Sequence, residues 1–393
     1  NIYDELHVDD DDDDDDDKRK KRGDHDSDSD DEDDSYHSAL NDISKQSMIE
    51  ANKSRQEELN QISKLTVESL ELLLNIIKYM LRLMFLPLGD NIPVISMHNN
   101  FILPCLNGRT ETEIRILALE CHGLCGLLDK DVAIGVMVVA AIFVSKSEHP
   151  KLIESGIKVM CDLLATHGVS IVQGDREKSI DTMAVARVFY RTIKNDKIPE
   201  AQAIVAEGLF KLFLCNVIDD EELLEMTILK YFDPMVLKND KLKQCLEFCI
   251  PTYCYARESH QALLAKICED TIRRLFRDWD NIQLLNSKEW VNRPTTIKFL
   301  IEKFSEWTCP WNLALLSEDE MRKSGNHIDF GISLLKLMRE FDPSRAIEKR
   351  LFKPMITQLS QIVLTPEVGV SKLVEFKKEL CNPQLFKGQI HVA

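Results

Sequence analysis

Apolar residues recur at helical spacing from about Lys53 to the end of the chain, and the alternating pattern of strands is almost absent. The pattern is clearest in four segments, each of which opens with polar residues and continues with apolar residues at i, i+3, i+4 and i+7. These segments are residues 111–130, 149–168, 198–217 and 238–257. Because this spacing places the apolar side chains on one face of a helix, the sequence predicts an all-α fold.

The four segments are also similar to one another, and they begin 38, 49 and 40 residues apart. A period of about 40 residues is typical of two-helix solenoid repeats of the HEAT or armadillo type. The second helix of each pair would come from intervening segments such as 131–144 and 219–232. We therefore expect residues 53–393 to form one curved α-solenoid of roughly seven or eight repeats.

Two stretches interrupt the helical pattern. Residues 174–179, with the sequence GDREKS, are expected to lie in a loop between helices. Residues 307–327 contain Pro310 and Gly325 and predict a longer connection. The helical pattern resumes after this connection and continues to the C-terminus.

Residues 1–52 differ from the rest in composition. Residues 1–34 hold 19 acidic and 5 basic residues, whereas the remaining chain holds 47 acidic and 44 basic residues. A segment with so few apolar residues and such blocks of like charge cannot bury enough surface to become ordered. We expect residues 1–52 to be a disordered acidic linker. The net charge of −17 therefore says little about the folded part, which is nearly neutral and is free to hold local basic faces.

The acidic linker carries two candidate signals. A basic island could serve as a nuclear localisation signal or a tether to DNA, or could only balance the neighbouring aspartates. Ser27 and Ser29 each precede an acidic residue by three positions, a spacing that suits an acidophilic kinase but also arises by chance in any acidic tract. The basic island comprises Lys18, Arg19, Lys20, Lys21 and Arg22.

The cysteines and the apolar runs indicate the compartment. Eleven cysteines occur without a single C-x-x-C pair, which indicates reduced thiols in the cytosol or nucleus rather than a disulfide framework. No signal peptide precedes the acidic run, and since the chain opens at Asn1 we read it as an internal or C-terminal piece of a longer protein. The apolar run 132–144 is shorter than the ~20 residues of a membrane span and predicts a buried helix.

The stretch 120–131, ECHGLCGLLDKD, is the best candidate for a metal or nucleophile site. On a helix, however, Cys121 and Cys125 share the apolar face, while a structural zinc site would need more ligands and usually a short cysteine knuckle. We predict that both cysteines pack in the core and that His122 is either partly exposed or hydrogen-bonded. The same argument predicts core packing for a second group, which comprises Cys245, Cys249 and Cys254.

No motif for catalysis is present. The sequence holds no phosphate-binding glycine loop, no G-x-S-x-G elbow and no H-E-x-x-H helix, and its histidines are dispersed. We expect a protein that is not an enzyme, with no catalytic residue, bound metal, cofactor or small-molecule substrate.

Residues 101–133 carry a resemblance to a known family. An Ile-Leu-Pro turn at Ile102–Pro104 precedes a polar loop, Arg115 and a helix that closes on Leu-Leu-Asp. This arrangement resembles the opening of the C-terminal domain of the condensin subunit 3 (CAP-G) family, although His122 stands where the family pattern has an apolar residue. The helix positions that carry the resemblance are Leu119, Cys121, Gly123, Leu124, Leu127, Leu128 and Asp129.

The resemblance implies a non-catalytic HEAT subunit of a condensin complex that supports mitotic chromosome condensation. Such a subunit holds a segment of the kleisin subunit (CAP-H) and, with it, double-stranded DNA, and is joined through the kleisin to the SMC ATPase subunits. It would act in the nucleus and on mitotic chromosomes, with a cytoplasmic pool for part of the cell cycle, and would have no membrane partner. The alternative is a HEAT-type transport receptor or protein scaffold, which would bind protein but not DNA.

Two helical faces could supply the bases that duplex binding requires. Each lies opposite an apolar stripe on its own helix, and a charged stripe in that position is usually an ordinary solvated face. The first holds Arg187, Arg191 and Lys194, and the second holds Arg273, Arg274 and Arg277.

Overall fold

The computed structural model describes residues 64–84, 91–109, 111–173, 180–282, 293–341 and 346–386. These residues form helices and connecting turns with no strand among them, which confirms the all-α prediction. The acidic linker with its basic island and two serines lies outside the described residues, as does the predicted loop 174–179. The chain divides into two compact units, residues 1–182 and 183–393.

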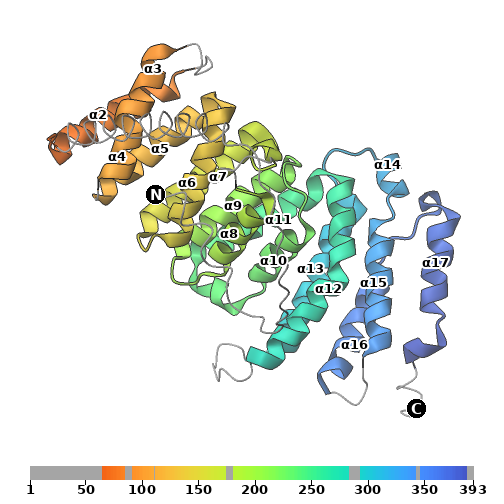
Figure 1. Ribbon diagram of the computed structural model, residues 1–393. Coiled ribbons are helices and arrows are strands. Elements are labelled where there is room, and N and C mark those ends of the chain that lie inside the picture. Colours follow the sequence, from red (N-terminus) through yellow and green to blue (C-terminus); the bar gives the residue numbers. More distant parts are fainter. Residues whose placement is uncertain are drawn as a thin grey trace, which may run out of the picture. The chain divides into compact units, whose positions relative to one another are not determined.

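The first unit is centred on α5. Figure 1 shows α2, α4, α6 and α7 around it, and α5 packs against all four, while α6 and α7 also pack against each other. Its elements are α2 (Val67–Arg82), α3 (Ile92–Met97), a π-helical turn (His98–Ile102), α4 (Leu103–Gly108), α5 (Thr112–Leu128), α6 (Lys130–Lys146), α7 (Pro150–His167) and a 3-10 turn (Gly168–Ile171).

Local signals in the sequence set the ends of α6. Its N-cap Asp129 accepts hydrogen bonds from the backbone N–H groups of Asp131 and Val132 at 2.8 and 3.2 Å, which satisfies donors that have no partner within the helix. The side chains of residues 136–144 are buried, as predicted for this apolar run. None of the helices described is long and apolar enough to cross a membrane.

Glycine allows α6 and α7 to approach closely. A Cβ atom at Gly156 would lie 2.7 Å from Val144 Cγ2 and 3.2 Å from the carbonyl oxygen of Ala140. Since both distances are below ordinary van der Waals contact, any larger residue would push the two helices apart.

The second unit contains two series of stacked helices. In one series α9, α11, α13 and α16 pack in succession, and in the other α10, α12, α15 and α17 do so. Its helices are α8 (Thr182–Lys194), α9 (Pro199–Leu214), α10 (Glu221–Tyr231), α11 (Asp240–Ala256), α12 (Glu258–Ile282), α13 (Arg293–Thr308), α14 (Glu318–Lys323), α15 (Asn326–Glu340), α16 (Ala346–Leu359) and α17 (Val370–Leu380). Short 3-10 turns lie at Pro234–Lys238, Pro310–Asn312, Pro366–Val368 and Pro383–Phe386.

The predicted repeat helices are all present. The four similar segments form α5, α7, α9 and α11, and the two intervening segments form α6 and α10. Buried amides join successive elements of the second unit: Asn239 Nδ2 donates to the Pro199 carbonyl at 2.8 Å, and Gln202 Nε2 donates to the Ile193 carbonyl at 3.0 Å. The register between α8, α9 and α11 is therefore fixed by hydrogen bonds as well as by apolar packing.

The predicted long connection at 307–327 needs correction. It contains the end of α13, a 3-10 turn and the short helix α14, and α15 already begins at Asn326. Ser317 and Glu320 form a capping box at the start of α14, in which each side chain bonds the other residue's backbone N–H. The sequence SEDE is the local signal for this capping box. The apolar periodicity is interrupted here, so periodicity alone does not predict α14.

Candidate functional site

The basic face on α8 is accessible. Arg187, Arg191 and Lys194 are exposed, whereas Val185 and Phe189 on the opposite side of the helix are buried. Lys194 Nζ donates to the hydroxyl of Tyr190 at 2.5 Å. Within the part of the chain that the structure describes, neither arginine of this face is paired with a carboxylate. Both guanidinium groups belong to exposed residues.

The basic face on α12 is different, because two of its arginines are bound within the protein. Arg273 forms ion pairs with Glu269, at 2.6 Å, and with Glu340 of α15. The Glu340 carboxylate raises the pKa of Arg273, and Arg273 in turn holds the pKa of Glu340 below its usual value. Arg274 Nε lies 3.2 Å from Oε1 of the buried Glu225 on α10. Binding a phosphate here would cost these contacts.

Arg277 lies on the same helix, and its side chain is outside the described residues. Further ion pairs follow the same series of helices, with Lys266 bound to Glu221 and Arg339 to Glu379. Each exposed pair of this kind contributes about 0–1 kcal/mol. The charged positions of α12 thus contribute to the stacking of α10, α12 and α15, and the α8 face is the better candidate for a nucleic-acid interface.

The core assignment of Cys121 and Cys125 is confirmed. Both side chains are fully buried, and burial raises the pKa of each thiol to about 12. The Cys121 thiol donates to the Leu74 carbonyl at 3.4 Å, which joins α5 to α2. Among the described residues, no cluster of three or more His, Cys, Asp or Glu side chains could hold a metal ion.

Replacing Cys121 or Cys125 by alanine is expected to lower the free energy of unfolding by about 1–2 kcal/mol, since each change leaves a small cavity in a closed core. Thermal or urea unfolding of the two variants measures the loss. Cys381→Ala is the matched control because Cys381 is exposed. If the purified protein contains stoichiometric zinc that the Cys121 variant loses, the packing role is refuted.

His122 is hydrogen-bonded and not partly exposed. Its Nδ1 lies 2.8 Å from Nε2 of His98, which the π-helical turn before α4 brings beneath α5. Both rings are buried. Burial and then the neighbouring His98 lower the pKa of His122 to about 3, and burial also lowers the pKa of His98. Burial therefore favours the neutral form of both rings.

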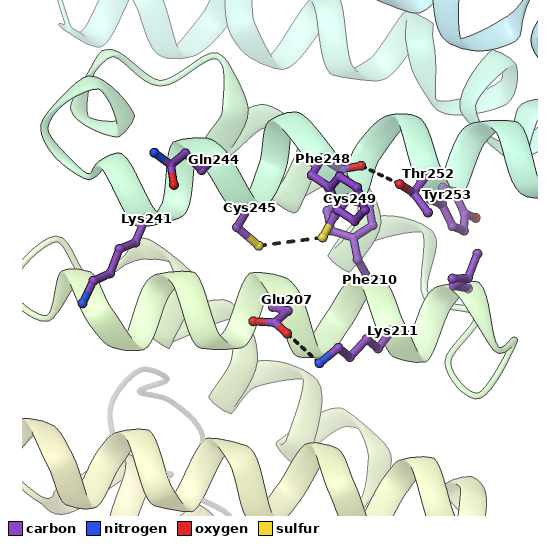
Figure 2. Close-up of a pocket in the computed structure, with 11 residues that line it drawn as sticks. Glu207, Phe210, Lys211, Lys241, Gln244, Cys245, Phe248, Cys249, Thr252 and Tyr253 are labelled. Carbon is purple, nitrogen blue, oxygen red and sulfur yellow. Dashed lines mark hydrogen bonds and ion pairs between the residues drawn. The ribbon is translucent and has the colours of Figure 1, made fainter.

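A groove of about 480 Å³ lies between α9 and α11. Figure 2 shows Phe210 and the ion pair of Glu207 with Lys211 along α9, facing the cysteines of α11. The core prediction is right for Cys254, which is fully buried, and wrong for Cys245 and Cys249, which are half-buried and line the groove. Their spacing is helical as predicted, but this side of α11 faces the groove and is not closed by apolar packing.

Paired helices stacked in two series are the architecture of a HEAT/armadillo-type α-solenoid. The family described as "Nuclear condensing complex subunits, C-term domain" matches residues 73–363, and the chain belongs to this family. The condensin resemblance expected from residues 101–133 is thereby confirmed.

Curated relatives and a solved structure agree with the family. The chain is 34% identical over 299 residues to condensin complex subunit 3 of Saccharomyces cerevisiae, covering 76% of this chain and 28% of that protein. It is 26% identical over 203 residues to the Schizosaccharomyces pombe protein, covering 50% of this chain and 22% of that one. The fold matches a chain in the crystal structure of the S. pombe condensin Cnd3–Cnd2 subcomplex, with a TM-score of 0.65, 19% identity, and coverage of 83% of this chain and 40% of that chain.

Proposed function

We propose that this chain is the C-terminal part of a non-catalytic condensin HEAT subunit that binds the kleisin-type subunit and double-stranded DNA. The observation that carries the proposal is the family match over residues 73–363. The kleisin partnership is supported by the fold match, since the matched relative was solved as a Cnd3–Cnd2 subcomplex. The kleisin would link the chain to the SMC ATPase subunits, and the assembly would support mitotic chromosome condensation in the nucleus, with a cytoplasmic pool for part of the cell cycle.

The DNA part of the proposal relies on the α8 face. Duplex affinity comes largely from cations that displace counterions from phosphates, and Arg187, Arg191 and Lys194 are exposed on one side of a helix. Because residues beyond the acidic linker are nearly neutral in total charge, a few clustered bases would give modest affinity. Bases of the kleisin-type subunit would then add to the same site.

The acidic linker would supply regulation. Its basic island from Lys18 to Arg22 is proposed as a nuclear localisation signal, and Ser27 and Ser29 as acceptors for an acidophilic kinase. Phosphate groups there would add negative charge to a tract that would compete with DNA for basic faces.

The direct test is to express the chain with the kleisin-type subunit and titrate labelled duplex DNA at several salt concentrations. We expect co-purification of the two proteins and duplex binding that falls steeply as salt rises. The alternative, a transport receptor or scaffold, would instead bind a small GTPase or a protein cargo and leave the duplex free. Failure to co-purify together with salt-independent DNA affinity would contradict the proposal.

A further inference from the structure

The groove between α9 and α11 contains two neighbouring thiols. Cys245 and Cys249 lie one turn apart on α11, with 3.9 Å between their sulfur atoms, and Figure 2 shows this pair facing α9. Six cysteines of the chain are buried, and the exposed Cys215 and Cys381 and the half-buried Cys309 do not line the groove. The pair is therefore the place where two thiols cooperate in reach of solvent.

The surroundings distinguish the two sulfurs. Cys245 Sγ lies 3.8 Å from the carbonyl oxygen of Ala203 on α9, an acceptor that favours its protonated form. When Cys245 turns its single S–H from Ala203 to Cys249, this hydrogen bond stabilises a thiolate on Cys249 and lowers the pKa of Cys249. The positive charge of Lys211 favours the thiolate form of either sulfur. Burial and Glu207 oppose this shift. The Ala203 contact keeps the proton on Cys245 and so favours Cys249 as the nucleophile of the pair.

The groove also offers room and charge for a small anionic peptide. Its volume is about 480 Å³, with Phe210 and Phe248 among its apolar walls. Two lysines stand at its rim, Lys211 in an ion pair with Glu207 and Lys241 at 3.6 Å from Glu200. Exchange of these surface partners for the carboxylates of a ligand would cost little, because exposed ion pairs contribute only about 0–1 kcal/mol.

We propose that Cys249 is a site of reversible S-glutathionylation, with the adduct held in the α9–α11 groove. The Cys249 thiolate attacks one sulfur of oxidised glutathione, whose disulfide bond breaks as the new Cys249–glutathione disulfide forms. The other glutathione leaves as a thiolate and takes a proton from water. Cys249 is oxidised and one glutathione is reduced, so the step needs no other oxidant.

The geometry of α11 explains why the adduct would persist. Side chains at i and i+4 on a helix have Cβ atoms about 5–6 Å apart, whereas a disulfide requires about 3.5–4.5 Å. Attack of Cys245 on the adduct would therefore have to distort the helix. This geometry allows Cys245 to donate a hydrogen bond to Cys249 but disfavours a disulfide bond between the two residues.

The test is to incubate the reduced full chain with oxidised glutathione and follow each cysteine over time by peptide mass analysis. We expect one glutathionyl group to appear on Cys249 first, at least several-fold faster than on the exposed Cys381. This ratio is internal to the wild-type protein, so it does not depend on whether a variant folds.

Variants then separate the two roles. Cys249→Ser should abolish the early modification. Cys245→Ala should slow it a few-fold, because loss of the hydrogen-bond donor raises the pKa of Cys249 and reduces its thiolate fraction. The higher intrinsic nucleophilicity of the Cys249 thiolate would offset only part of this loss. Cys381→Ser is the matched control and should leave the rate at Cys249 unchanged. Equal rates at Cys249 and Cys381, or an internal Cys245–Cys249 disulfide as the main product, would overturn the proposal.

Discussion

Replacing Arg187, Arg191 and Lys194 together by glutamate is expected to weaken duplex binding by the kleisin complex on the order of tenfold or more at low salt. The loss should be the same for all DNA sequences, because contacts to phosphates carry no base information. The slope of log affinity against log salt should become shallower by about 0.9 for each phosphate contact removed. Binding of the kleisin-type subunit should survive, and titration of labelled duplex at several salt concentrations measures these effects.

A second triple variant separates a local contact from a general charge effect. Lys353, Lys377 and Lys378 are exposed on α16 and α17, and changing them to glutamate alters the net charge by the same amount. An equal loss of affinity in this control would attribute the effect to total charge. Unchanged affinity in the α8 variant would place the DNA contact elsewhere on the chain.

The α12 arginines provide a contrasting expectation. Because Arg273 and Arg274 already bind Glu340 and Glu225, their replacement should act first on stability. Charge reversal at Arg274 would leave the buried Glu225 carboxylate next to a like charge, which is a costly arrangement. From the sequence alone, the α8 and α12 faces were equal candidates for DNA contact. The ion pairs of Arg273 and Arg274 within the protein make the α12 face the weaker candidate.

The protein is expected to lose stability as the pH falls from 7 towards 5, well before most carboxylates titrate. Burial holds the pKa of His327 at about 4 and that of His122 at about 3, against 6.5 for an ordinary histidine. Below pH 6.5 these histidines therefore bind protons in the unfolded chain but stay neutral in the folded chain. The stabilising contribution is fully present above pH 6.5 and falls by about 1.4 kcal/mol per pH unit for each such histidine.

The hydrogen bonds around these rings give the physical reason. The backbone N–H of Val363 donates to Nδ1 of His327 at 3.2 Å, so protonation of that nitrogen would break the contact. In the other pair, Nε2 of His98 and Nδ1 of His122 face each other at 2.8 Å, and one of the two must remain an acceptor. A proton on Nδ1 of His327 would therefore cost a hydrogen bond, and a charge on either ring of the His98–His122 pair would be buried.

Urea unfolding at several pH values between 7.5 and 5 measures this dependence. In a double variant, His98→Gln with His122→Gln, the pH dependence should be reduced, since the amides can keep one hydrogen bond and do not titrate. His149→Gln is the control because His149 is exposed at the start of α7. A double variant with the wild-type pH dependence would show that the buried pair does not cause it.

The sequence by itself determined the helices and their repetition. Segments such as 111–130 and 198–217 form α5 and α9 because helical periodicity is a local property, readable from neighbours three and four positions apart. It also determined that Cys121 and Cys125 are core residues, since they share a face with leucines on one helix. The resemblance at residues 101–133 identified the family on the same kind of local pattern, and the match over 73–363 confirms it.

The tertiary structure alone decided which polar groups are free and which are bound. Glu340 is 67 residues from Arg273, and His98 is 24 residues from His122, and no local pattern links such positions. It also opened one side of α11, so that Cys245 and Cys249 line a groove while Cys254 on the same helix is buried. The physical reason is that helix formation depends on spacing along the chain, whereas charge neutralisation, burial and cavities depend on which surfaces of different helices meet.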